Sequence, residues 1–485
     1  MLKFTSINQK NPQKISSKIR ANHFNEIYSK FASNKAEEQS SRCSQCGIPF
    51  CQVHCPLQNN IPDWLKLTSE DRLEEAYEIS SATNNMPEVC GRICPQDRLC
   101  EGNCVIEKSG HGAVTIGSIE KYITDVAWEK GWVKNIKVLR EKKKSVGIIG
   151  SGPAGLAAAE QLRKKGYQIT IYDRYDRAGG LLIYGIPNFK LEKEIIKKRT
   201  KRLKDSGIKF ILNCEIGSSI SFDELQHEHD AILIATGVYK SREINLNKTK
   251  ANNVIPALEY LIASNKKGLK DKVLDFESGK LDAKNKKVVV IGGGDTAMDC
   301  VRTAVRQGAK SIECLYRRDQ NNMPGSQREV NNAIEEGVNF NWLTLPNEYL
   351  GQKKIKQLKI VKMQLGPPDE SGRKTPELIK GSEEYLETDL IIEALGFEPE
   401  NIPKLFNKEE LKVTRWGTLK IDYKNMMTSI EGVFAAGDIV RGASLVVWGI
   451  KDGRDVAENI DSFINQKEKY KSHLNNKKIE TLKNV

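Results

Sequence analysis

The chain has 485 residues, 39% of them hydrophobic, and a net charge of +13 that rests mainly on lysine. This length predicts roughly two to four domains, because single cores seldom grow past about 250–300 residues. No apolar run approaches the ~18–20 residues of a membrane helix and no nucleic-acid module accompanies the charge, so we expect neither membrane nor nucleic-acid binding.

Residues 1–140 are expected to form a helical, loop-rich region. The pattern predicts short helices at Ile61–Leu67 and Asp71–Ser80, separated by polar turns and cysteine-bearing loops. The first acidic residue is Glu26, and the stretch before it is basic. That stretch has neither the apolar segment of a secretory signal nor the amphipathic period of a transit peptide, so we expect a cytoplasmic protein.

Eight of the eleven cysteines lie between Cys43 and Cys104. In a large chain without a secretory signal, clustered thiols indicate metal ligands rather than disulfides. Cys43-x2-Cys46-x4-Cys51-x3-Cys55-Pro is followed by Cys90-x3-Cys94-x5-Cys100-x3-Cys104. Dense spacing ending in Cys-Pro is typical of ferredoxins, whereas zinc sites show two separated C-x2-C pairs. The spacing favours iron–sulfur clusters, with zinc as the alternative.

A first βαβ unit follows the basic linker Arg140–Lys144. It consists of a strand at Ser145–Ile149, a helix at Leu156–Lys165 and a strand at Gln168–Tyr172. Between strand and helix lies a G-x-G-x-x-G turn whose residues include Gly150, Gly152, Pro153, Ala154 and Gly155. Such a turn brings the backbone and a helix N-terminus to a pyrophosphate, and Asp173 after the second strand can accept hydrogen bonds from a ribose.

A second βαβ unit repeats this pattern at Lys287–Ile291, Thr296–Gln307 and Ser311–Tyr316. Its fingerprint contains Gly292, Gly294, Asp295, Thr296 and Ala297. No acid ends its second strand; Arg317 and Arg318 stand there instead, with Arg328 as a weaker candidate. Guanidinium groups can bind a 2′-phosphate that a carboxylate would repel, so this site is predicted to be specific for NADP(H).

Two different dinucleotide sites in one chain indicate FAD facing NADPH. Asp230–Gly237 and Asp389–Gly396 are further strands that close on a glycine, and Gly432–Asp438 is a third segment of this kind. We expect Gly237 to contact a cofactor. Residues 366–388 are expected to form a hairpin or surface loop, and the tail after Phe463 a solvated, frayed end.

Together, these motifs resemble those of the family of NADPH-dependent glutamate synthase small subunits, which also includes the electron-input half of dihydropyrimidine dehydrogenase. The resemblance runs in order from about residue 40 to 460, on residues 43–51, 90–95, 150–156, 179–187 and 292–299. It implies an α/β fold in which a helical iron–sulfur domain precedes tandem, Rossmann-like FAD- and NADPH-binding domains of the disulfide-reductase type. The implied divisions are 1–140, 141–245 (FAD), 246–398 (NADPH) and 399–485 (FAD, second part, and tail).

The resemblance also implies ligands for two 4Fe-4S clusters. One cluster would be held by Cys43, Cys46, Cys51 and Cys104, and the other by Cys55, Cys94, Cys100 and Glu120. Cys90 would not be a ligand. Residues along the flavin would include Gly180, Leu181, Tyr184 and Ile186, and Gly437 with Asp438 would close the flavin site.

The implied activity is oxidation of NADPH by FAD and relay of electrons through the clusters to a large (alpha) subunit that makes glutamate from glutamine and 2-oxoglutarate. We nominate no catalytic acid or base, because hydride transfer requires positioning. The chain shows no N-terminal cysteine nucleophile and no (β/α)8 repeat, so we expect this chemistry in the partner, and the basic surface could help docking. The alternatives are a related flavoprotein that feeds another acceptor and a non-enzymatic metal-binding scaffold.

Overall fold

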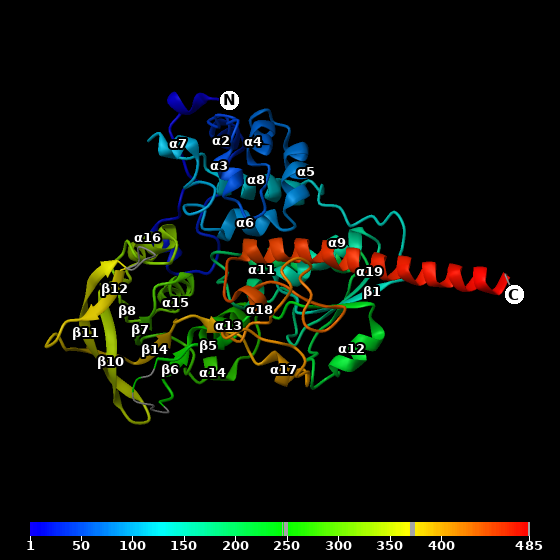
Figure 1. The fold of residues 1–485 in the computed structure, drawn as a ribbon. Coiled ribbons are helices and arrows are strands. Elements are labelled where there is room, and N and C mark those ends of the chain that lie inside the picture. The colour runs from blue at the N-terminus through cyan, green and yellow to red at the C-terminus, as the bar shows by residue number, and fades with distance from the viewer. Residues whose placement is uncertain (245, 247–250, 369–373, 484–485) are drawn as a thin grey trace.

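The computed structural model describes residues 1–244, 246, 251–368 and 374–483, with side chains up to residue 469. Figure 1 shows an N-terminal helical module above two α/β units, each built on its own parallel sheet. Each part has a core of its own buried apolar residues, centred for example on Trp64, Ile148 and Val290. In the described residues, no helix is both long enough and apolar enough to cross a membrane.

The N-terminal module is helical, as predicted. Its elements are η1 (Lys3–Thr5), α1 (Ser17–Arg20), α2 (Ser33–Ser40), α3 (Phe50–Val53), α4 (Ile61–Ser69), α5 (Leu73–Thr83), α6 (Pro87–Ile93), α7 (Val105–Lys108) and α8 (Ile116–Glu129). Helix α4 confirms the first predicted helix. Helix α5 starts two residues later than predicted because Asp71 has a φ of +56°, which an α-helix does not accommodate.

The first sheet is parallel, in the order β16-β4-β1-β2-β3. Its strands are β1 (Ser145–Ile149), β2 (Gln168–Tyr172), β3 (Lys209–Ile211), β4 (Ala231–Ile234) and β16 (Val433–Ala435). The accompanying helices are α9 (Pro153–Lys164), α10 (Leu181–Tyr184), α11 (Lys193–Asp205), α12 (Phe222–Glu228), α17 (Ile402–Leu405), α18 (Asp438–Arg441) and α19 (Val446–Lys483). Because β16 comes from the C-terminal part of the chain, the second unit is inserted in the sequence between β4 and β16 of the first.

The second sheet is also parallel, in the order β6-β14-β7-β8-β9. Its strands are β6 (Val254–Pro256), β7 (Lys287–Ile291), β8 (Ser311–Tyr316), β9 (Asn339–Trp342) and β14 (Leu390–Glu393), and its helices are α13 (Ala257–Gly268), α14 (Leu274–Glu277), α15 (Asp295–Arg306) and α16 (Gln327–Glu335). We call residues 254–393 the second unit. Both βαβ predictions are confirmed by parallel pairing of β1 with β2 and of β7 with β8.

An antiparallel sheet extends the second unit. It contains β10 (Thr344–Gly351), β11 (Ile355–Pro368), β12 (Lys374–Leu378) and β13 (Glu384–Glu387). The predicted hairpin at 366–388 is confirmed by the pairing of β11 with β12, although residues 369–373 lie outside the described ones. The prediction of a frayed tail is wrong for the backbone, because α19 continues to Lys483 (Figure 1). No Gly or Pro occurs after Gly453 to interrupt the helix, and the segment is rich in lysine, which has a high helix propensity.

The chain enters and leaves the second unit at neighbouring points. Strand β5 (Lys240–Ser241) precedes the unit and β15 (Phe397–Glu398) follows it, and the two pair antiparallel. The connection to the first unit therefore consists of two adjacent chain segments.

Candidate functional site

A single cavity of about 610 Å³ lies where the three parts meet. Its wall includes the glycine-rich loops of both sheets and Cys94–Pro95 of the N-terminal module. Most of the predicted dinucleotide-binding residues line it: Gly150, Gly152, Pro153, Ala154, Asp173, Leu181, Ile186, Gly237, Gly294, Asp295, Thr296, Gly437 and Asp438. The fold thus brings together the carboxyl ends of strands from two sheets, which is where α/β proteins bind ligands.

The first glycine loop has the geometry that a pyrophosphate site requires. Gly150 has a φ of +106°, and a Cβ there would overlap the carbonyl oxygen of Ala235. A Cβ on Gly155 would overlap the carbonyl of Gly150, so this glycine allows α9 to pack against β1. No atom lies within 4 Å of the position of a Cβ on Gly152. Two glycines are therefore required by packing, and the middle one leaves backbone accessible to a ligand.

Asp173 lies at the end of β2 and faces this loop. Its Oδ2 accepts hydrogen bonds from the backbone N–H of Ser151 (2.8 Å) and from the Ser151 hydroxyl (2.5 Å), and its Oδ1 accepts one from the N–H of Tyr175 (2.9 Å). These donors fix the carboxylate at the cavity wall and leave it the capacity to accept further hydrogen bonds.

The residues predicted along the flavin divide into two sets. Leu181 and Ile186 line the cavity, whereas Gly180 and Tyr184 lie behind its wall. Tyr184 is buried and donates its hydroxyl hydrogen bond to Asp176, away from the cavity. Gly180 has a φ of +53° and allows the chain to turn into α10.

Asp438 lies at the opposite wall, immediately after β16. Its Oδ1 accepts a hydrogen bond from Ser444 Oγ at 2.6 Å. Burial raises the pKa of Asp438 to about 6. The carboxyl is thus desolvated, and its charged form depends on hydrogen bonds such as the one from Ser444.

The second fingerprint faces the same cavity. Gly294, Asp295 and Thr296 line it, whereas Gly292 and Ala297 are covered: a Cβ on Gly292 would overlap the carbonyl of Ala394, and Ala297 is fully buried. As at Gly152, no atom lies within 4 Å of a Cβ placed on Gly294. In both loops, therefore, the first glycine is required by packing, and the middle glycine leaves backbone accessible to a ligand.

The arginines predicted for the 2′-phosphate do not line this cavity. Arg317 is exposed at the end of β8, and Arg318 is buried, with its Nε donating to the carbonyl of Lys374 at 3.2 Å. Arg328 lies on α16, and its Nη2 donates to the carbonyl of Arg92 at 3.2 Å. Arg317 is thus the most accessible of the three candidates.

Sequence reasoning missed several cavity residues. The Nζ atom of Lys190, on the loop after α10, lies 2.7 Å from Oδ1 of Asp299 on α15. Arg174 pairs with Glu400 at 2.9 Å and lies over the ring of Tyr239. Asp299 directly follows the second fingerprint, which was a usable signal. No local pattern marks the other four, because their partners are distant in the sequence.

The first group of cysteines is brought together as predicted. Cys43, Cys46, Cys51 and Cys104 line one small cavity between α3, α4 and α7. Burial raises the pKa of the Cys51 thiol to about 12, and its neighbours Cys104, Cys43 and Cys46 raise it further. Gln45 Nε2 donates to the Cys43 sulfur at 3.3 Å. These are soft donors in a shielded site with an amide donor beside them, which suits an iron–sulfur cluster.

The second group surrounds Glu120 on α8. Burial raises the pKa of this carboxyl to about 8, and its Oε1 accepts hydrogen bonds from Asn59 Nδ2 (3.1 Å) and Asn84 Nδ2 (3.3 Å). Its charge raises the pKa of three nearby thiols, those of Cys55, Cys94 and Cys100. Cys90 is hydrogen-bonded to Cys94. Cys94 also lines the large cavity, so this group is the one adjacent to the dinucleotide loops.

The charge of Cys51 raises the pKa of the Cys100 thiol, so the two groups of cysteines lie side by side. In the part of the chain that the structure describes, no three His, Cys, Asp or Glu side chains converge closely enough to hold one metal ion.

Comparisons with known proteins match both the N-terminal module and the α/β part of the chain. Residues 20–132 match a family described as dihydropyrimidine dehydrogenase domain II, 4Fe-4S cluster, and residues 144–453 match pyridine nucleotide-disulphide oxidoreductase. The glutamate synthase (NADPH) small chain of Azospirillum brasilense is 60% identical over 467 residues, 96% of this chain and 97% of the relative. The putative oxidoreductase AegA of Escherichia coli K12 is 42% identical over 95% of this chain and 70% of the relative.

Among solved structures, FprA from Mycobacterium tuberculosis in complex with NADPH aligns with a TM-score of 0.57 at 20% identity. The alignment covers 68% of this chain and 86% of FprA. The likeness concerns the fold, and with the two family matches it confirms the expected class: a helical iron–sulfur module followed by α/β units of the disulfide-reductase type.

Proposed function

This chain belongs to the family of glutamate synthase (NADPH) small chains, and from that premise we propose that it is the electron-input subunit of such an enzyme. It oxidises NADPH with FAD and relays the electrons through two 4Fe-4S clusters. A large catalytic subunit, absent from this chain, receives them and makes glutamate from glutamine and 2-oxoglutarate. We propose a cytoplasmic location for this complex and retain the domain divisions predicted from the sequence.

The observation that supports this proposal best is the shared cavity. Both glycine-rich loops and Cys94 line one space of about 610 Å³. An electron donor bound at the second loop would face an acceptor bound at the first, with a cysteine ligand in the same wall. Bound FAD supplies the chemistry that accepts two electrons together and releases them singly.

The residues of the chain would bind and orient these groups. Asp173 would accept hydrogen bonds from the adenosine ribose of FAD, and Asp438 from its ribityl chain. Gly152 and Gly294 would admit the two pyrophosphates, and Arg317 with Arg318 would bind the 2′-phosphate of NADPH. This last step requires Arg318 to exchange its bond with the Lys374 carbonyl for the phosphate.

The order of the clusters follows from their positions. The group of Cys55, Cys94, Cys100 and Glu120 is next to the cavity and would receive electrons first. The group of Cys43, Cys46, Cys51 and Cys104 lies beyond it.

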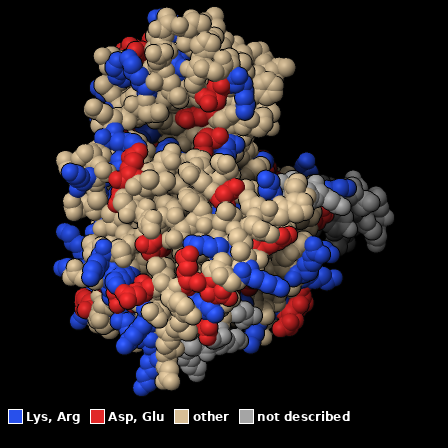
Figure 2. Space-filling model, turned by 90° about the vertical axis from the view of Figure 1, so that its left-hand side faces the viewer, with Lys and Arg blue, Asp and Glu red and all other residues tan. Residues whose placement is uncertain are grey.

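Exposed apolar side chains surround the group of Cys43, Cys46, Cys51 and Cys104. They are Ile48, Phe50, Val53 and Val105. We call these four residues the apolar patch. Two of them, Phe50 and Val105, also line the small cavity of the cysteines. Figure 2 shows that, on the face drawn there, the upper lobe formed by the N-terminal module carries few charged residues. The apolar patch would therefore be the docking surface of the large subunit, because exposed apolar patches mark protein interfaces.

Anaerobic titration with NADPH tests the proposal. We expect the flavin absorbance to bleach and EPR signals of reduced clusters to follow, with NADPH reacting far faster than NADH. A protein purified without flavin, or flavin that NADPH leaves oxidised, would refute the electron-input role. Preference for NADH would refute only the role of Arg317 and Arg318.

The relation to AegA, a putative oxidoreductase, favours a second candidate in which the same input unit feeds another acceptor. Mixing the NADPH-reduced protein with a glutaminase-bearing large subunit distinguishes the two. Reoxidation of the clusters in the presence of glutamine and 2-oxoglutarate supports the first candidate; clusters that stay reduced support the second.

A further inference from the structure

The orientation of the second unit is not fixed by its chain connections alone. The unit is joined to the first sheet by two adjacent segments that pair as β5 and β15. Paired segments at one edge leave rotation about that edge to be restrained by non-covalent contacts, as in hinged domains. Some of these contacts lie on α13, where Asn265 Nδ2 donates to the carbonyls of Tyr184 and Gly185. A second set lies on α15 and α16 and involves the N-terminal part of the chain.

Residues 10–28, which we call the crossing segment, run from the N-terminal module to these helices. Near its start, the N–H of Lys10 donates to Gln39 Oε1 at 2.9 Å, which attaches the segment to α2. Near its end, the carbonyl of Phe24 accepts a hydrogen bond from Asn188 Nδ2 at 2.8 Å, on the loop after α10. The crossing segment therefore contacts the N-terminal module, the first unit and the second unit.

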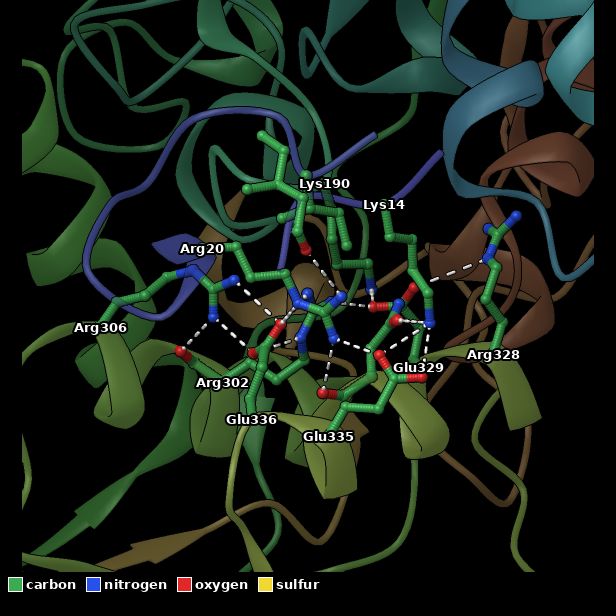
Figure 3. Close-up of polar contacts among 12 residues, drawn as sticks. Lys14, Arg20, Lys190, Arg302, Arg306, Arg328, Glu329, Glu335 and Glu336 are labelled. Carbon is green, nitrogen blue, oxygen red and sulfur yellow. Dashed lines mark hydrogen bonds and ion pairs between the residues drawn. The ribbon is translucent and has the colours of Figure 1, made fainter. Parts of the chain in front are cut away.

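Arg20 is the centre of the contact with the second unit (Figure 3). Its Nε donates to Glu336 Oε1 at 2.9 Å and its Nη2 to Glu335 Oε2 at 2.6 Å. The side chains of Arg20 and Glu336 are 1% and 0% exposed. Lys14 adds a partly exposed pair with Glu335 at 2.6 Å. A guanidinium buried to this degree is retained only where its partners stay in place, because separating the pair would leave uncompensated buried charges.

The charged residues around Arg20 come from all three parts of the molecule, but the carboxylates among them all lie on the second unit. On the second unit this cluster contains the carboxylates Asp299, Glu329, Glu335 and Glu336 and the guanidinium groups of Arg302, Arg306 and Arg328. The other cations come from elsewhere: Lys14 and Arg20 from the crossing segment and Lys190 from the first unit. Carboxylates of the second unit thus pair with cations from both other parts: Glu335 and Glu336 with the crossing segment, and Asp299 with the first unit.

This cluster reaches the cofactor cavity through Lys190. Its Nζ lies 2.7 Å from Asp299 and 3.8 Å from Glu329, and Glu329 in turn is bonded to Arg302 Nη1 at 2.5 Å. Arg302 also holds Glu336, the partner of Arg20. Lys190 lines the 610 Å³ cavity and a second one of about 490 Å³ beneath the crossing segment. The arrangement therefore extends continuously from Arg20 to the wall between the two glycine loops.

We propose that Arg20 and Lys14 are positioning residues for hydride transfer, which hold the second unit so that its dinucleotide faces the one bound by the first unit. The inference rests on the proposed function. It adds a role for the N-terminal segment that is separate from cluster binding. Hydride transfer is sensitive to such placement, because a displacement of about 1 Å can cost about 100-fold in rate.

The test compares full-length, cofactor-loaded variants. Arg20→Gln removes the charge, Arg20→Lys keeps it, and Lys14→Gln removes the exposed pair. Lys10→Gln is the matched control, because Lys10 belongs to the same segment but pairs with Glu38 of the N-terminal module. The measurements are the anaerobic stopped-flow rate of flavin reduction at saturating NADPH, hydrogen exchange of the α16 amides, and flavin and iron content.

We expect flavin reduction by NADPH to slow by at least about tenfold in Arg20→Gln, less in Lys14→Gln, and not in Lys10→Gln. Arg20→Lys should recover part of the rate. Exchange in α16 should accelerate in the same order, while flavin and iron content and reduction by dithionite stay at the wild-type level. Glu336 keeps Arg302 and Arg306 as partners, so the variants are expected to fold.

Wild-type rates together with wild-type exchange in Arg20→Gln would overturn the inference. If Arg20→Gln instead loses flavin or iron, Lys14→Gln decides: an unchanged rate there overturns the inference, and a slowed rate supports it. Failure of the wild-type protein to be reduced by NADPH would be a different result, since it contradicts the proposed function itself.

Discussion

Among single residues, the carboxylates around the cavity differ in the donors that already hold them. Asp173 accepts two hydrogen bonds from Ser151 of the glycine loop and one from the N–H of Tyr175, whereas Ser444 is the residue that donates to Asp438. A carboxylate with fewer protein donors depends more on a ligand to stabilise its charge. Asp438 is therefore the residue at which substitution is expected to affect the flavin most directly.

We predict that Asp438→Asn weakens FAD binding by about tenfold or more, because a charge-assisted hydrogen bond contributes about 1.5–3 kcal/mol. The measurement is the dissociation constant of FAD from the reconstituted protein, followed by flavin fluorescence. Asp422→Asn, at an exposed position of the same unit, is the control and should bind FAD normally. Equal affinity in both variants would exclude Asp438 from the flavin site.

Glu120 offers a second test at this scale. It is buried among three cysteines, and two asparagine amides hold one of its oxygens. We predict that Glu120→Ala loses or alters one of two cluster EPR signals and leaves the other intact. Glu129→Ala, on the exposed end of the same helix, should retain both. Two unchanged signals in Glu120→Ala would show that the fourth ligand lies elsewhere.

At the scale of helices and strands, the sequence predicted the features that depend on residues close together in the chain. Both glycine loops, their strands and the helices that follow were recognisable because their spacing is local. The start of α5 was shifted by a left-handed residue, Asp71, that has no strong signature. The pairs Lys190–Asp299 and Arg174–Glu400 could not be foreseen, because each joins residues more than 100 positions apart that only the fold brings together.

The first glycine loop allows folding and binding to be separated experimentally. Gly155→Ala would place a Cβ against the Gly150 carbonyl, so we expect a loss of about 1–3 kcal/mol in the free energy of unfolding. Gly152→Ala meets open space and has an extended backbone with φ −73°, so stability should be unchanged while FAD affinity falls. Urea unfolding of the flavin-free proteins and FAD titration distinguish the two effects. A stable Gly155→Ala protein would contradict the packing argument.

For the whole molecule, we propose that electrons pass from the cavity to the cysteine group around Glu120 (the inner group). From there they would pass to the group of Cys43, Cys46, Cys51 and Cys104 (the outer group). The inner group shares a wall with the cavity, and the outer group lies beneath the apolar patch. Spacing alone could not give this order, because the two runs of cysteines contribute to both groups. The family resemblance implied the grouping, and in the structure Cys104 lies beside Cys43 and Cys55 beside Cys100.

The apolar patch yields the last prediction, which separates electron entry from electron exit. Ile48 and Val53 are 67% and 59% exposed and do not line the small cavity of the cysteines, so replacing both with aspartate should disturb neither the core nor that cavity. Because the change would introduce two charges into a desolvated interface, we expect binding to the large subunit to weaken at least about 100-fold. Reduction of the flavin by NADPH, and of an artificial dye by the clusters, should remain at the wild-type rate.

Leu274→Asp is the control: this leucine is 70% exposed on the second unit, and its replacement should leave complex formation intact. Analytical ultracentrifugation of the mixed subunits, together with dye reduction, measures both properties. Full complex formation by the double variant would place the electron exit on another surface.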